Sequence, residues 1–182
     1  MAYRNGTYIA FHANGTNRPG ESDMDYYRMM TAWTANPDDD FTMVNSHDKA
    51  SSVRDNSKRA TLRASIQERL RNSKNMVLIV GDTTRHDDDW VPFEIEQAID
   101  VYGLPVVAAY PGYTAIVKPA DLASLWPPAI AERMHRNAAR VIHIPFKKEP
   151  IMDAIGQFHL NNHPKSPFSY YSVEAHKSWK LL

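Results

Sequence analysis

Apolar residues along the chain gather in five short runs, separated by segments whose apolar positions recur at helical spacing. The runs lie at residues 7–13, 41–47, 75–82, 104–112 and 140–146. Short runs of apolar and aromatic residues, bounded by glycine, proline and asparagine, are typical of β-strands. The run "NMVLIVGD" at 75–82 is almost continuously apolar, which is typical of a central strand buried on both faces.

The segments between the runs predict helices. They begin at Ser22 or Asp23, at Ser57, after the aspartates at 87–89, at Pro127–Pro128 and at Glu149. In the first helix, the spacing places Tyr26, Met29, Met30 and Trp33 on one side. Strands that alternate with helices predict a three-layer α/β fold with a central, mostly parallel five-stranded sheet. We expect one domain over residues 1–182, with a core at about 7–158 and an aromatic tail at 159–182 that has no clear period.

Ligands of such sheets bind beyond the carboxyl ends of the strands, near the point where the strand order reverses. The strand ends predict a rim of residues made of Phe11 and His12, Ser46 and His47, Gly81 to Thr84, and Tyr110 to Gly112. Ser46 and His47 have the chemistry of a nucleophile and its base, but no G-x-S-x-G turn surrounds them.

The stretch "TRHDDDWVPFEIEQAI" at 84–99 contains a further candidate, Glu94. One of the three aspartates at 87–89 can cap a helix, and Pro92 suits its first turn because proline has no amide hydrogen to lose. Trp90 and Glu94 are four residues apart and therefore share a helix face. Two interpretations of Glu94 follow: a charge favoured by the helix dipole, or the group that does the chemistry.

Composition excludes several classes of site. The chain has 21 basic and 21 acidic residues, and the arginines at 53–71 are spread around their helix, which argues against a nucleic-acid partner. It has no cysteine, no H-E-x-x-H pattern and no glycine-rich phosphate loop, so we expect no metal and no bound cofactor. No apolar run approaches the roughly 20 residues that span a bilayer, and the first residues are too polar for a signal peptide. We expect a cytoplasmic protein without membrane contact.

Three motifs together resemble a known family. "TYIAFHA" at 7–13, "VLIVGDTT" at 77–84 and "WVPFEIEQAI" at 90–99 are similar in order and spacing to the TIR-like proteins of the Thoeris antiphage defence system. They also resemble the wider TIR superfamily, whose corresponding helix carries a W-x-x-x-E pattern. The similarity extends from about Thr7 to Gly112 and implies a flavodoxin-like arrangement of the sheet.

The resemblance implies an enzyme that cleaves the bond between nicotinamide and ribose in NAD, which is its substrate. Many family members close the ADP-ribose into a cyclic isomer, and in Thoeris systems this product is a second messenger for a separate effector protein. The catalytic glutamate of the family falls on Glu94, and its aromatic-histidine pair lining the pocket falls on Phe11 and His12. The rim adds Ser46, Thr83 and Trp90 as candidate substrate contacts, although Trp90 also suits a core anchor.

The resemblance also implies self-association for activity and a phage-derived trigger. The sequence leaves two other hypotheses for the function open. One is a TIR-like module that assembles with partners and does no chemistry. The other is an N-glycosidase or deoxyribosyltransferase on a related fold, because those enzymes also use one glutamate on a ribose.

Overall fold

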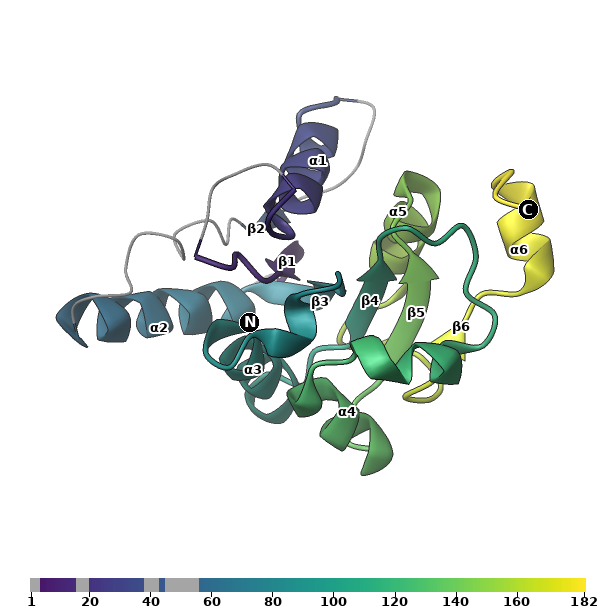
Figure 1. Cartoon of the computed structure of the whole chain (residues 1–182). Coiled ribbons are helices and arrows are strands. Elements are labelled where there is room, and N and C mark those ends of the chain that lie inside the picture. The colour runs from purple at the N-terminus through teal and green to yellow at the C-terminus, as the bar shows by residue number, and fades with distance from the viewer. Residues whose placement is uncertain (1–3, 16–19, 38–42, 45–55) are drawn as a thin grey trace.

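Six parallel strands form one sheet at the centre of the molecule (Figure 1). The computed structural model describes residues 4–15, 20–37, 43–44 and 56–182, except for the side chains of 44 and 56–58. The strands are β1 (Gly6–Ala10), β2 (Met43–Val44), β3 (Ser73–Ile79), β4 (Val106–Tyr110), β5 (Val141–Pro145) and β6 (Ser169–Tyr170), in the order β2-β1-β3-β4-β5-β6. Every neighbouring pair is parallel. The five strands expected from the sequence are therefore confirmed, and the short β6 adds a sixth.

Helices cover both faces of the sheet, as the alternating pattern predicts (Figure 1). The helices that flank the sheet are α1 (Met24–Thr34) and α5 (Lys148–Gln157) on one face, and α2 (Asn56–Arg71), α3 (Trp90–Glu96) and α4 (Pro128–His135) on the other. The alternation of side chains along β1 divides the core between the two faces. Tyr8 and Ala10 pack toward α2 and α3, whereas Ile9 and Phe11 pack toward α1.

Shorter helical pieces complete the chain between these elements. They are η2 (Thr84–His86), the π-helix η3 (Gln97–Val101) that continues α3, η4 (Pro119–Leu125) and α6 (Val173–Ser178). Ile95, Ala98 and Ile99 along α3 and η3 are all buried against the sheet. None of the helices among the described residues is both long and apolar enough to cross a bilayer.

The buried side of α1 is made of Met24, Tyr27 and Met30, and only Met30 belongs to the side that the spacing indicated. Met30 is fully buried as expected, but Met29 is 47% exposed, and Met24 and Tyr27 fill the core in its place. Tyr26 is only half-buried, with its ring at the edge of Phe146. Of the side that the spacing indicated, only Met30 is therefore fully buried, because the first turn of α1 directs Met24 and Tyr27 toward the sheet.

Specific side-chain contacts anchor the tail after Leu160. The fully buried ring of His176 donates from Nδ1 to the carbonyl of Ser172 (2.7 Å) and accepts at Nε2 from the amide of Ile116 (3.4 Å). The hydroxyl of Tyr171 donates to the carboxylate of Asp153 on α5. The tail therefore packs onto the β4 and β5 side of the sheet (Figure 1).

Candidate active site

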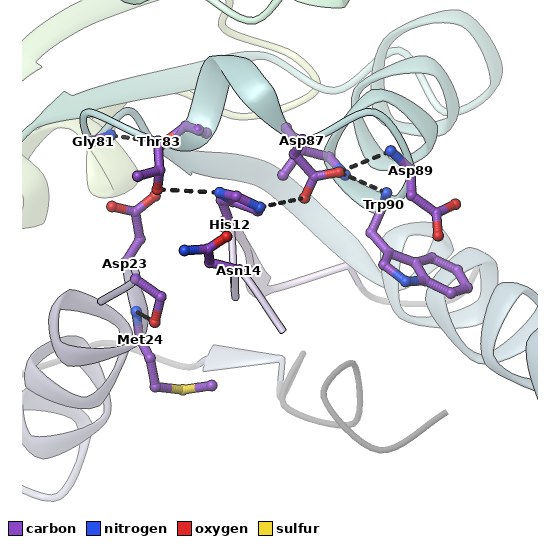
Figure 2. A network of polar contacts seen from close by, with 12 residues as sticks. His12, Asn14, Asp23, Met24, Gly81, Thr83, Asp87, Asp89 and Trp90 are labelled. Atoms are coloured by element: carbon purple, nitrogen blue, oxygen red, sulfur yellow. Dashed lines mark hydrogen bonds and ion pairs between the residues drawn. The ribbon is translucent and has the colours of Figure 1, made fainter. Parts of the chain in front are cut away.

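The sheet order reverses between β1 and β3, so the loops that follow these strands leave the sheet side by side. His12 follows β1, and Thr83 follows β3. The Nδ1 atom of His12 lies 3.1 Å from the Oγ1 atom of Thr83, which joins the two loops (Figure 2). Two residues that the sequence placed on the ligand rim thus meet at the point where α/β folds of this type bind their ligands.

Asp87 connects this pair to the start of α3. Its Oδ2 atom lies 4.0 Å from Nε2 of His12, on the side of the ring opposite Thr83 (Figure 2). Its Oδ1 atom accepts the backbone amides of Asp89 and Trp90, both at 2.9 Å, and the amide of Val91 at 3.3 Å. Among the three aspartates that could cap the helix, Asp87 therefore satisfies the free amides, and its other carboxylate oxygen lies beside the His12 ring.

A pocket of about 190 Å³ opens between the loop after β1 and the start of α3. It is lined by Phe11, His12, Ala13, Asn14, Gly15, His86, Asp87, Asp88, Asp89 and Trp90. It is smaller than the roughly 300–1,000 Å³ of typical ligand pockets, so it can hold only one end of a dinucleotide. Three of the candidate substrate contacts, Phe11, His12 and Trp90, come together in its wall.

Phe11 and Trp90 contribute to this wall differently. The ring of Phe11 stacks on Tyr27 with 4.7 Å between centroids, and the residue is 0% exposed, so it lies behind the pocket surface. Trp90 is also buried, and the guanidinium of Arg59 lies 5.1 Å from its ring centroid while pairing with Asp89. In this conformation both aromatic residues act as supports of the pocket. Their roles as substrate contacts stay predictions.

Glu94 lies one helical turn beyond Trp90 and is 0% exposed. Glu94 is therefore not exposed to solvent, and its role as the group that does the chemistry stays a prediction. Its Oε1 atom accepts a hydrogen bond from the hydroxyl of Tyr8 on β1, which is also fully buried. Burial and the neighbouring Glu94 carboxylate raise the pKa of Tyr8 well above its ordinary value, so this phenol stays a donor at physiological pH. Glu94 is absent from the residues that line the pocket.

Asp23 is a buried carboxyl that the sequence indicated only as a helix cap. It is 4% exposed, and its Oδ2 atom accepts from the hydroxyl of Thr84 at 2.7 Å, while its amide donates to the carbonyl of His12 at 3.1 Å. Burial raises the pKa of the Asp23 carboxyl, and the hydrogen bond from Thr84 opposes that shift. Gly81 permits this approach, because a Cβ at that position would lie 2.0 Å from Oδ1 of Asp23.

A second cavity of about 560 Å³ lies on the other side of Thr83. It is lined by Gly20, Glu21, Ser22, Asp23, Asp25, Tyr26, Met29, Gly81, Asp82, Thr83, Pro111, Gly112 and Tyr113. The rim expected from the sequence is thus divided: Phe11 and His12 line the pocket, and Gly81 to Thr83 line the second cavity. The contact between His12 and Thr83 lies at the boundary between the two. Ser46 and His47 lie outside the described residues.

The sheet order, the pocket at the start of α3 and the W-x-x-x-E pattern of Trp90 and Glu94 define a TIR-like domain. A family model described as the TIR-like domain of the Thoeris protein ThsB matches residues 8–116. The chain therefore belongs to this family of antiphage defence proteins. The match begins within β1, includes β3, α3 and β4, and ends before β5 and the tail.

Proposed function

We propose that this protein cleaves the bond between nicotinamide and ribose in NAD, with Glu94 as the catalytic residue. We further propose that the protein acts in the bacterial cytoplasm and releases a cyclic isomer of ADP-ribose, which serves as a second messenger for a separate effector. Besides family membership, one observation carries the proposal. A carboxylate stands at a fully buried position of α3, next to the pocket, where packing alone favours an apolar residue.

The reaction places few demands on the protein, since nicotinamide is already a good leaving group. The bond between C1′ and the ring nitrogen breaks, and its electron pair neutralises the pyridinium nitrogen. An oxocarbenium-like ribose results, which a carboxylate can stabilise by facing the positive charge and accepting hydrogen bonds from the ribose hydroxyls. Attack by water at C1′ with loss of a proton gives ADP-ribose, whereas attack by an oxygen or nitrogen of the same molecule gives a cyclic product.

The charges around the pocket indicate which end of NAD would enter it. Asp87, Asp88 and Asp89 line one wall, and the loop opposite supplies the amide of Asn14 and the imidazole of His12. Carboxylates attract the cationic nicotinamide ring and repel the diphosphate. We therefore propose that nicotinamide and its ribose occupy the pocket beside Trp90, with the diphosphate directed outward.

A second function is favoured by one specific observation. Glu94 is fully buried in this conformation, which also suits a TIR-like module that assembles with partners and does no chemistry. In either case we propose self-association, and for the enzyme a phage-derived trigger. The two functions differ in whether nicotinamide is released from NAD.

Incubation of the purified protein with NAD, alone and with lysate of phage-infected cells, tests the proposal. Nicotinamide and the second product are separated by chromatography. The matched variant is Glu94→Gln, because glutamine keeps the size of the side chain and an oxygen that accepts from Tyr8. We expect its nicotinamide release to fall by about a hundredfold or more. Equal release by the two proteins would refute Glu94 as the catalytic residue. No release under either condition would favour the interaction module.

A further inference from the structure

Tyr8 occupies a position in the core from which it reaches Glu94. It lies in the middle of β1, where the alternation of the strand directs its side chain toward α2 and α3. Val91 and Ile95 of α3 pack in the same core layer, and Tyr8 itself is 0% exposed. Its hydroxyl donates to Oε1 of Glu94, so a polar pair crosses an otherwise apolar interface between the sheet and α3.

In this structure Glu94 is bonded to Tyr8 and is not among the residues that line the pocket. A catalytic carboxylate has to come within hydrogen-bond distance of the ribose. The pocket wall contains Trp90, but Glu94 follows one turn later and is 0% exposed. Arg59 contacts both Asp89 and the ring of Trp90, so the beginning of α3 is held in place above the buried carboxylate.

We propose that Tyr8 is a positioning residue that keeps Glu94 withdrawn in a resting state, and that turnover requires Glu94 to leave Tyr8 and turn toward the pocket. The proposal rests on the function proposed above and concerns the regulation of the same site. Tyr8 would not touch the substrate itself.

The physical basis is an exchange of hydrogen-bond donors. A carboxylate that leaves the Tyr8 hydroxyl must find an equivalent donor, since an uncompensated charge in the protein interior is costly. The hydroxyls of the NAD ribose are donors of the same kind. Glu94 therefore has two hydrogen-bonded states, one on Tyr8 and one on the ribose. Substrate or trigger shifts the equilibrium between them to the extent that it binds one state better than the other. Removal of the Tyr8 hydroxyl takes away the donor to Oε1 in the resting state and leaves the ribose hydroxyls of the substrate unchanged.

The test uses Tyr8→Phe in the full-length chain, with two readouts. Nicotinamide release without lysate reports activity, and labelling of Glu94 by a carbodiimide and an amine, read by peptide mass spectrometry, reports its exposure. We expect release by Tyr8→Phe to exceed that of the wild type by about tenfold, as for the loss of one hydrogen bond to a charged group, and labelling of Glu94 to rise. Tyr171→Phe removes another hydroxyl bound to a carboxylate, in the tail, and should change neither readout.

Several outcomes would overturn the proposal. Strong labelling of Glu94 in the resting wild type would do so without any variant, even if Tyr8→Phe failed to fold. A lower release by a folded Tyr8→Phe, with KM unchanged and kcat reduced, would show instead that the hydroxyl assists the chemistry. If Tyr8→Phe and the wild type released nicotinamide equally and Glu94 were equally protected from labelling in both, the role of Tyr8 would be refuted but the proposed NAD cleavage would not. Increased labelling with no nicotinamide release by any protein, with or without lysate, would support the contact and refute NAD cleavage.

Discussion

His143 is predicted to make the stability of this protein fall in mild acid. The ring is 1% exposed, between β4 and the tail. Its Nε2 atom lies 3.0 Å from the carbonyl of Pro167, which can only accept, so Nε2 carries the proton. Nδ1 then accepts from the hydroxyl of Tyr110 at 2.7 Å, and that oxygen accepts from the indole of Trp126 at 2.9 Å. Both nitrogens of the neutral ring are thus hydrogen-bonded, and a second proton on Nδ1 would break the hydrogen bond from Tyr110.

The size of the effect follows from the pKa. Burial lowers the pKa of His143 from its ordinary 6.5 to about 4. Because the unfolded chain binds a proton at higher pH than the folded one, stability is complete above pH 6.5 and falls as the pH decreases toward 4. One pKa unit corresponds to 1.36 kcal/mol, so the full loss is about 3 kcal/mol. About 2 kcal/mol of it is expected between pH 7 and pH 5.

Urea unfolding at pH 7 and pH 5, followed by circular dichroism, measures this loss. The comparison is with His143→Asn, whose side-chain oxygen can still accept from Tyr110 but does not titrate. Asparagine is smaller, so this variant starts at lower stability, but its change between the two pH values should be about 2 kcal/mol less than that of the wild type. His135→Asn is the control, because His135 is exposed on α4 and its removal should preserve the pH dependence. An equal loss in wild type and His143→Asn would refute the assignment.

Two further predictions concern the loops around the pocket. Gly81→Ala places a Cβ 2.0 Å from Oδ1 of Asp23 and should cost about 1–3 kcal/mol in urea unfolding, whereas Gly156→Ala in α5 meets nothing within 4 Å and should be neutral or slightly stabilising. A tolerated Gly81→Ala would contradict the close approach. Asp87→Ala removes the cap of α3 and should cost about 1–2 kcal/mol, and nicotinamide release should fall because the pocket wall loses a carboxylate beside His12. Asp88→Ala, an exposed neighbour that caps no helix amide, should not lower stability, and an equal loss in urea unfolding would refute the capping role of Asp87.

The strands could be predicted because their pattern is local. The run at 75–82 is apolar at nearly every position, and only a strand covered on both faces buries all of them. β3 at Ser73–Ile79 confirms this. The tail shows the opposite case. β6 and α6 are short, and their sequences have no clear period. They are held by single contacts to distant residues, such as the hydrogen bond from the amide of Ile116 to His176, and such contacts leave no local pattern.

The candidate site was predictable in part for the same reason. The spacing of Trp90 and Glu94 and the strand ends at His12 and Thr83 are local features, so the sequence indicated them as candidates. Tyr8 was missed, because a tyrosine in an apolar strand looks like a core residue. Only the packing of α3 on β1 reveals that its hydroxyl reaches a carboxylate 86 residues away.

By itself, the sequence determined the α/β fold, the positions of the strands and the glutamate at the start of α3, since periodicity and family motifs are properties of neighbouring residues. The tertiary structure alone decided that Asp87 is the cap, that the rim is divided between two cavities, and that Glu94 is buried on Tyr8. These features depend on side chains from different strands and helices, and their distances are set only when the sheet and its helices pack together.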